Sequence, residues 1–116
     1  PLVLIMQIKA ALDNGEYICF NGDRYMNEKE TIRTRFMGSE VLMPSGPFKI
    51  AAKCRVPVVF YYAMREKNRT YRFIFSEAAV EHNRPIALLE QYTASLAHLI
   101  ERYPRQWFNF YNFWNE

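Results

Sequence analysis

The sequence has few of the residues that build disulfide frameworks, metal centres or nucleophilic active sites. Its 116 residues include only two cysteines, and neither Cys19 nor Cys54 belongs to a C-x-x-C pair or a Cys/His ligand spacing. We therefore expect two reduced core cysteines and no metal site. Patterns of the G-x-S-x-G, phosphate-loop and dinucleotide-binding kinds are also missing, so the sequence indicates no cofactor.

Long hydrophobic runs are missing as well. The longest, residues 2–6 and 56–64, are far shorter than a bilayer span, and no signal peptide is visible, so any membrane contact is expected to be peripheral. Half of the residues are hydrophobic, which predicts one folded domain over residues 1–116. The net charge of +3 favours acidic partners, which include nucleic acid, anionic lipid and an acidic carrier protein.

Hydrophobic periodicity predicts a mixture of helices and strands. The expected order is helix, strand, long loop, helix, strand, strand, helix, over residues 4–12, 17–20, 22–45, 46–54, 56–64, 71–76 and 88–103. Gly15 and Pro104 are typical of positions just beyond a helix end. The continuous apolar run at 56–64 predicts a central strand, and the alternating run at 71–76 predicts its antiparallel partner.

The same order of elements predicts an α/β fold. A strand, helix and strand between residues 17 and 64 would form a right-handed parallel crossover, to which the hairpin adds one antiparallel strand. We therefore expect a mixed, mainly parallel sheet with flanking helices, in the order α-β-α-β-β-α.

Two short segments are candidates for an anion site. Ser45 can cap the helix that begins at Gly46, and the free N–H groups there, with Lys49 one turn in, would attract phosphate or carboxylate. Asp23 and Arg24 follow the predicted first strand, where ligands gather in α/β folds. The alternatives are a plain capped helix and a turn with a surface charge pair.

The remaining candidate residues are aromatic side chains near the end of the sequence and two histidines. The last twelve residues contain six aromatic side chains, and Trp107, Tyr111 and Trp114 share one helical face, which favours packing in the core or against a partner over contact with a lipid interface. His82 and His98 are expected to be surface or packing residues rather than catalytic bases.

Six segments follow one another in a characteristic order along most of the chain. They are ICFNGDRY, Phe36-Met37-Gly38, Pro44-Ser45-Gly46-Pro47, KIAAKC, Pro57-Val58-Val59 and Tyr103-Pro104-Arg105-Gln106-Trp107. By these segments the sequence resembles the lipid A biosynthesis (lauroyl/myristoyl) acyltransferase family of the lysophospholipid acyltransferase superfamily.

The resemblance implies acyl transfer from an acyl thioester, on acyl carrier protein or coenzyme A, to a lipid acceptor such as a lipid A precursor or a lysophospholipid. It also implies a place at the cytoplasmic face of the bacterial inner membrane. Asp23, Arg24, Ser45, Gly46 and Lys49 are then the expected substrate-binding residues. One departure is that family members carry Gln where this chain has Arg24.

A second departure concerns the catalytic residues. The family's motif is a His separated by four residues from an Asp or Glu, and neither histidine of this chain is followed by a carboxylate at that spacing. The chain also starts at Pro1 inside an apolar run. We therefore expect the carboxyl-terminal part of an acyltransferase domain, inactive and homo-oligomeric when isolated.

Two alternatives remain open at this stage. One is a non-catalytic domain that binds an anion or a lipid. The other, less favoured, is a nucleic-acid module that stacks bases on the hairpin residues Arg69, Tyr71, Arg72 and Phe73, although alternating strands of any half-buried hairpin look the same.

Overall fold

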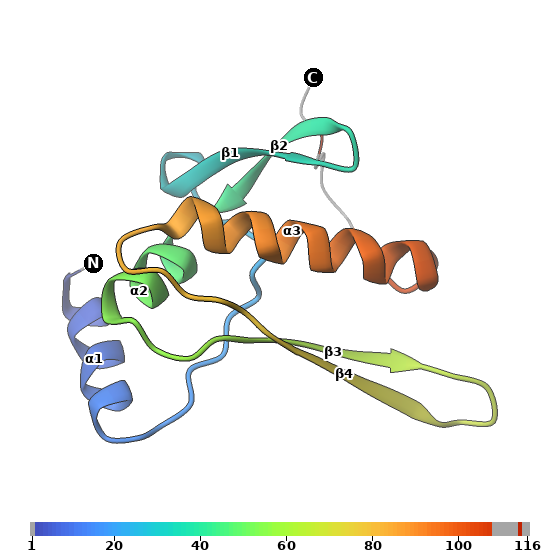
Figure 1. The fold of residues 1–116 in the computed structure, drawn as a ribbon, viewed down its shortest axis with the longest axis horizontal. Helices are drawn as coiled ribbons and strands as arrows, with labels where there is room; N and C mark the ends of the chain where they lie inside the picture. The colour runs from blue at the N-terminus through green and yellow to red at the C-terminus, as the bar shows by residue number, and fades with distance from the viewer. Residues whose placement is uncertain (1, 108–113, 115–116) are drawn as a thin grey trace.

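The computed structural model describes residues 2–107 and residue 114 (Figure 1). The elements run in the order α1 (Leu2–Asp13), η1 (Glu28–Glu30), β1 (Thr31–Phe36), β2 (Ser39–Pro44), α2 (Gly46–Cys54), β3 (Val59–Arg65), β4 (Tyr71–Glu77) and α3 (Pro85–Arg102). The fold is therefore a mixture of α and β elements, as the periodicity predicts.

Strands β3 and β4 form the antiparallel hairpin that the sequence predicts. Their register pairs Tyr61 with Phe75 and Arg65 with Tyr71. Alternation places Phe60 and Tyr62 on the side that packs against the core, while Tyr61 lies on the opposite face. The hairpin prediction is thus confirmed.

The prediction of a mainly parallel sheet is wrong. The described residues form two separate two-stranded sheets, β1–β2 and β3–β4, and both are antiparallel. Residues 17–20 form no strand, and Tyr17 is 96% exposed. A short apolar run becomes a strand only when another strand offers it hydrogen bonds, and β3, predicted to be central, pairs with β4 alone within the described part of the chain.

The segment expected to be a long loop contains the β1–β2 hairpin. Its two-residue turn is Met37-Gly38, with φ of 51° and 88°, the left-handed backbone of a tight hairpin turn. Phe36 lies immediately before this turn and is 2% exposed. The hairpin therefore places the Phe36 side chain in the core, although residues 22–45 were expected to form only a loop.

The helices lie where the sequence predicts them. Helix α1 ends at Asp13, and Gly15, two residues further on, has a φ of 78° that permits the bond from the Glu16 N–H to the Ala11 carbonyl. Only Ile8 of this helix is buried, so much of its predicted apolar stripe faces outward. Cys19 is exposed and Cys54 half-buried, and both are free thiols. The expectation of a core position is therefore wrong for Cys19, which lies in a largely exposed segment without regular structure, and Cys54 is only partly buried.

Helix α3 is the centre of the core. Figure 1 shows it running between the β1–β2 hairpin and the β3–β4 hairpin. Its buried side chains pack with Phe36 and Met43 of the first hairpin, Phe48 of α2 and Phe60 of β3. The helix residues in this cluster are Leu88, Leu89, Leu96, Leu99 and Ile100. No described helix is long and apolar enough to cross a membrane.

Candidate functional site

The start of α2 holds three of the predicted site residues. Ser45 precedes the helix as predicted, but its hydroxyl makes no capping hydrogen bond, and the residue is buried. Its backbone is helical rather than extended, and its N–H donates to the Glu30 carbonyl at 2.9 Å, which prolongs the pairing of β1 with β2 by one residue. The predicted side-chain cap is therefore wrong, and Ser45 does not occupy the first-turn donors of the helix.

The approach to this helix end is open. A Cβ atom built on Gly46 would meet nothing within 4 Å, and Lys49, one turn further on, is exposed. Backbone N–H groups and an exposed ammonium thus lie at the positive end of a nine-residue helix. Such an arrangement suits an anion.

Asp23 and Arg24 form a tightly held pair in the turn after residue 21. The Arg24 guanidinium donates to Asp23 Oδ2 at 2.7 Å, and the Trp107 indole N–H donates to the same oxygen at 2.9 Å. The guanidinium also lies 5.9 Å from the centre of the Trp107 ring. With side chains 17% and 33% exposed, Asp23 is largely shielded and Arg24 keeps part of its surface in solvent.

Tyr92 of α3 contacts both parts of the candidate site, the turn that carries Asp23 and Arg24 and the first part of α2. A Cβ atom on Gly22 would lie 3.0 Å from the Tyr92 ring, so the turn that carries Asp23 packs directly against this side chain. The centre of the same ring lies 5.5 Å from the ring centre of Phe48, which precedes Lys49 in α2. The turn and the first part of α2 therefore share one aromatic contact. That Arg24 and Lys49 reach one ligand stays a prediction.

Tyr62, whose hydroxyl senses the charge of Asp23, and its partner Ser95 are two further polar residues near this turn that no sequence motif indicates. The Tyr62 hydroxyl and Ser95 Oγ are 3.0 Å apart. Burial raises the pKa of Tyr62, the bond to Ser95 lowers it, and the negative charge of Asp23 adds a smaller increase. Tyr62 therefore stays a neutral phenol and is a source of hydrogen bonds, not of charge.

The segment after α3 fastens the end of this helix to β3. The Gln106 side chain accepts from the Arg65 N–H and donates to the Arg65 carbonyl, each at 2.8 Å. The Tyr103 hydroxyl donates to the Glu66 carboxylate. Trp107 then reaches Asp23, so three residues of the last segment that carries the family resemblance have identifiable structural contacts.

The bond between Tyr103 and Glu66 predicts a pH dependence of stability. Mainly because of this bond, the pKa of Glu66 lies below 4.5 and that of Tyr103 above 10.0 in the folded state. The contribution of Glu66 is present above its unfolded pKa and disappears as pH falls through its folded value. The contribution of Tyr103 is present below pH 10.0 and disappears as pH rises through its folded value.

Tyr103→Phe should therefore lower the melting temperature most between these limits and least at both extremes. Arg72, which also binds Glu66 at 3.0 Å, preserves part of the acid-side effect in the variant. Melting curves across pH test this, with the exposed Tyr71→Phe as control. A Tyr103→Phe deficit of equal size at every pH would contradict the assignment.

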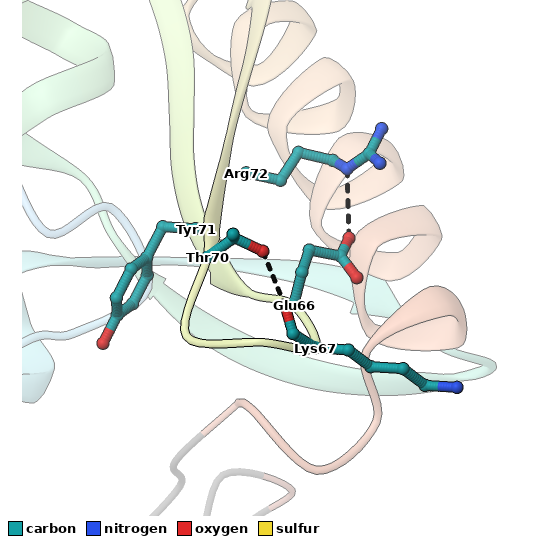
Figure 2. Close-up of a pocket in the computed structure, with 5 residues that line it drawn as sticks. All are labelled: Glu66, Lys67, Thr70, Tyr71 and Arg72. Atoms are coloured by element: carbon teal, nitrogen blue, oxygen red, sulfur yellow. Dashed lines mark hydrogen bonds and ion pairs between the residues drawn. The ribbon is translucent and has the colours of Figure 1, made fainter.

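A shallow hollow lies at the tip of the β3–β4 hairpin, away from the predicted site residues. Figure 2 shows Glu66 bound to Arg72, Thr70 bound to the Lys67 carbonyl, and the Lys67 side chain extending away from both. The hollow measures about 400 Å³, and Tyr71 completes its lining. Because Glu66 is already bound by Arg72 and Tyr103, we assign the hollow no catalytic role.

Both histidines are exposed. His82 lies beside Asn83 in the loop before α3, and His98 lies on the outer side of that helix, so the expectation of surface positions is confirmed. Residues 2–107 and 114 contain no group of three metal-ligating side chains. Of the three aromatic residues predicted to pack together, Trp107 and Trp114 pack against Phe36, while Tyr111 lies outside the described residues.

Comparison with known proteins relates this arrangement to one family. The family model described as bacterial lipid A biosynthesis acyltransferase matches residues 4–116. No curated protein and no solved structure matches the chain.

Proposed function

The chain belongs to the bacterial lipid A biosynthesis acyltransferase family, and we propose that it forms the substrate-binding part of such an enzyme. The reaction moves a fatty acyl chain from an acyl thioester, on acyl carrier protein or coenzyme A, to a lipid acceptor. A lipid A precursor or a lysophospholipid would serve as acceptor. The proposed place of action is the cytoplasmic face of the bacterial inner membrane.

The observation that carries this proposal is the fixed guanidinium of Arg24. Two donors, Arg24 and the Trp107 indole, share one oxygen of Asp23, and the guanidinium remains partly exposed. A planar guanidinium held in place is suited to phosphate or carboxylate. The open start of α2 with Lys49 supplies further positive potential on the other side of the Tyr92 contact.

Acyl transfer to a hydroxyl needs two further functions. A base must take the hydroxyl proton as oxygen attacks the thioester carbon, and donors must stabilise the resulting oxyanion. His82 and His98 are exposed, and neither has a carboxylate at the His-x-x-x-x-Asp/Glu spacing, so the proposal assigns the base to a part of the enzyme outside residues 1–116. The residues of this chain then bind and orient the charged substrate groups.

The anion site at the start of α2 is tested by Lys49→Ala in the full-length enzyme. Because Lys49 is exposed, its loss should leave the melting temperature nearly unchanged, while the Michaelis constant for donor or acceptor should rise about fivefold or more. Lys53→Ala is the matched control, since Lys53 is also exposed but lies in the last turn of α2. A lowered melting temperature with unchanged Michaelis constants would assign Lys49 to structure alone.

The catalytic assignment is tested by the isolated chain. Purified residues 1–116 should show no acyl transfer above background with any acyl thioester and lipid acceptor, because neither histidine forms the required dyad. Substantial transfer that increases with protein concentration would overturn this assignment. The full-length gene separates the enzyme from the alternative, a non-catalytic anion- or lipid-binding domain. A His-x-x-x-x-Asp/Glu motif supports the former, and its absence supports the latter.

A further inference from the structure

The β3–β4 hairpin exposes a face made mainly of aromatic side chains. Tyr61 stacks on Phe73 with ring centres 6.0 Å apart and also contacts Phe75 at 5.1 Å. The exposed fractions on this face are 54% for Val59, 53% for Tyr61, 63% for Tyr71, 58% for Phe73 and 65% for Phe75. These five side chains form an apolar surface more than half open to solvent, with Arg65 opposite Tyr71 at its tip end and Glu77 opposite Val59 at its other end. Exposed apolar surfaces of this kind mark binding sites.

The tip of the same hairpin is strongly basic. Residues 65–72, REKNRTYR, contain four basic side chains and one acidic one. The acidic residue, Glu66, is bound by Arg72 at 3.0 Å, whereas Lys67 and Arg69 are exposed. Figure 2 shows the Lys67 ammonium extending away from that ion pair. An aromatic face thus ends in a tip with excess positive charge.

Helix α1 provides a second exposed apolar surface, and this one has no excess of positive charge beside it. Helix α1 exposes Leu2, Val3, Leu4, Ile5 and Met6. The only charged side chains of α1 are Lys9 and Asp13, which neutralise each other at 3.0 Å. Nothing on this helix indicates the charge of a partner, so α1 is useful only as a control.

We propose that the β3–β4 hairpin docks the protein on an anionic phospholipid bilayer. Tyrosine and phenylalanine side chains are stable at the boundary between headgroups and acyl chains. Lys67 and Arg69 would contact the lipid phosphates, and each basic residue near such a surface strengthens binding. The inference rests on the proposed function only in that the acceptor is a membrane lipid.

The ring geometry favours a lipid surface over single-stranded nucleic acid. Tyr61 and Phe73 are nearly parallel, with an interplanar angle of 10° and ring centres 6.0 Å apart, so one face of each ring is turned toward the other. Base stacking needs an open ring face, whereas an interface accommodates ring edges as well. Three of the residues that suggested nucleic-acid binding from the sequence, Arg69, Tyr71 and Phe73, are therefore assigned to lipid, while Arg72 binds Glu66.

Co-sedimentation of the whole chain with vesicles tests the proposal. The wild-type protein should bind vesicles containing phosphatidylglycerol more tightly than pure phosphatidylcholine, and added salt should weaken binding. The double variant Phe73→Ser/Phe75→Ser and the tip variant Lys67→Glu/Arg69→Glu should each reduce binding about tenfold or more. Ile5→Ser on α1 should bind as the wild type does. All four substituted hairpin residues are exposed, so melting temperatures should stay close to that of the wild type.

Three results would overturn the proposal. Vesicle binding that is unchanged in both hairpin variants, or lost in Ile5→Ser, would place the membrane contact elsewhere. A dimer by light scattering that dissociates in Phe73→Ser/Phe75→Ser, without vesicle binding, would assign the face to a second copy of the chain. Tighter binding to single-stranded RNA than to vesicles would assign it to nucleic acid. None of these results depends on the Lys49 kinetics, so the proposed function stands or falls separately.

Discussion

Phe36→Ala should lower the free energy of unfolding by about 3 to 5 kcal/mol, the range for truncating a large buried aromatic side chain. Phe36 is 2% exposed and lies within 6 Å of two indoles, with ring centres 5.7 Å from Trp107 and 5.9 Å from Trp114. Its removal would leave a cavity where the first hairpin, α3 and the last segment meet. Urea unfolding monitored by tryptophan fluorescence measures the loss and reports on both indoles.

Phe73→Ala is the matched control. The same chemical change is made on β4, where the side chain is 58% exposed and touches mainly Tyr61. It should cost about 1 kcal/mol or less, roughly the value of one exposed aromatic pair. Equal losses in the two variants would mean that Phe36 is not a core residue, and the contact between the β1–β2 hairpin and α3 would then be incorrect.

The part of the fold that could be predicted from the sequence is the part governed by local pattern. Alternation along residues 71–76 predicted β4, and the apolar spacing from Leu88 to Leu99 predicted α3. The β1–β2 hairpin was missed because its turn is Met37-Gly38. Asn or Asp before glycine is the usual signal for such a turn, and methionine in a left-handed backbone gives none.

The sheet could not be predicted because strand pairing depends on partners distant in sequence. Residues 17–20 have the composition of a buried strand, and residues 59–65 that of a central one. Composition does not state which strand lies beside which. In the described residues β3 pairs with its sequence neighbour, and residues 17–20 pair with none, so the expected parallel crossover does not form.

In the candidate site, too, contacts between neighbours in sequence could be predicted and contacts between distant residues could not. Asp23 and Arg24 are adjacent in sequence, so their pairing could be proposed directly. The third member of the cluster, Trp107, lies 84 positions after Asp23; the sequence marks it as a packing residue and as part of the family resemblance, but not as a partner of Asp23. Ser45 is a further example, because its N–H binds the carbonyl of Glu30, a contact between strands that the local sequence around the helix start does not indicate.

Trp107→Phe should lower the free energy of unfolding by about 1.5 to 3 kcal/mol, the value of a hydrogen bond to a charged group. The substitution keeps an aromatic ring beside Phe36 and Arg24 but removes the N–H that binds Asp23 Oδ2 at 2.9 Å. Asp23 is only 17% exposed, so water replaces the lost donor poorly. Thermal and urea unfolding measure the loss.

Trp114→Phe is the control that separates the carboxylate bond from the loss of indole volume. Trp114 also packs on Phe36, but its N–H donates at 3.2 Å to the neutral Phe36 carbonyl, so this bond should contribute only about 0.5 to 1.5 kcal/mol. The Trp107 variant should therefore lose more, and it alone should also weaken anion binding, because Asp23 would hold Arg24 less firmly. Equal losses, or unchanged binding of inorganic phosphate and phospholipid in Trp107→Phe, would show that Arg24 needs no support from the indole. The anion site would then rest on the start of α2 and Lys49.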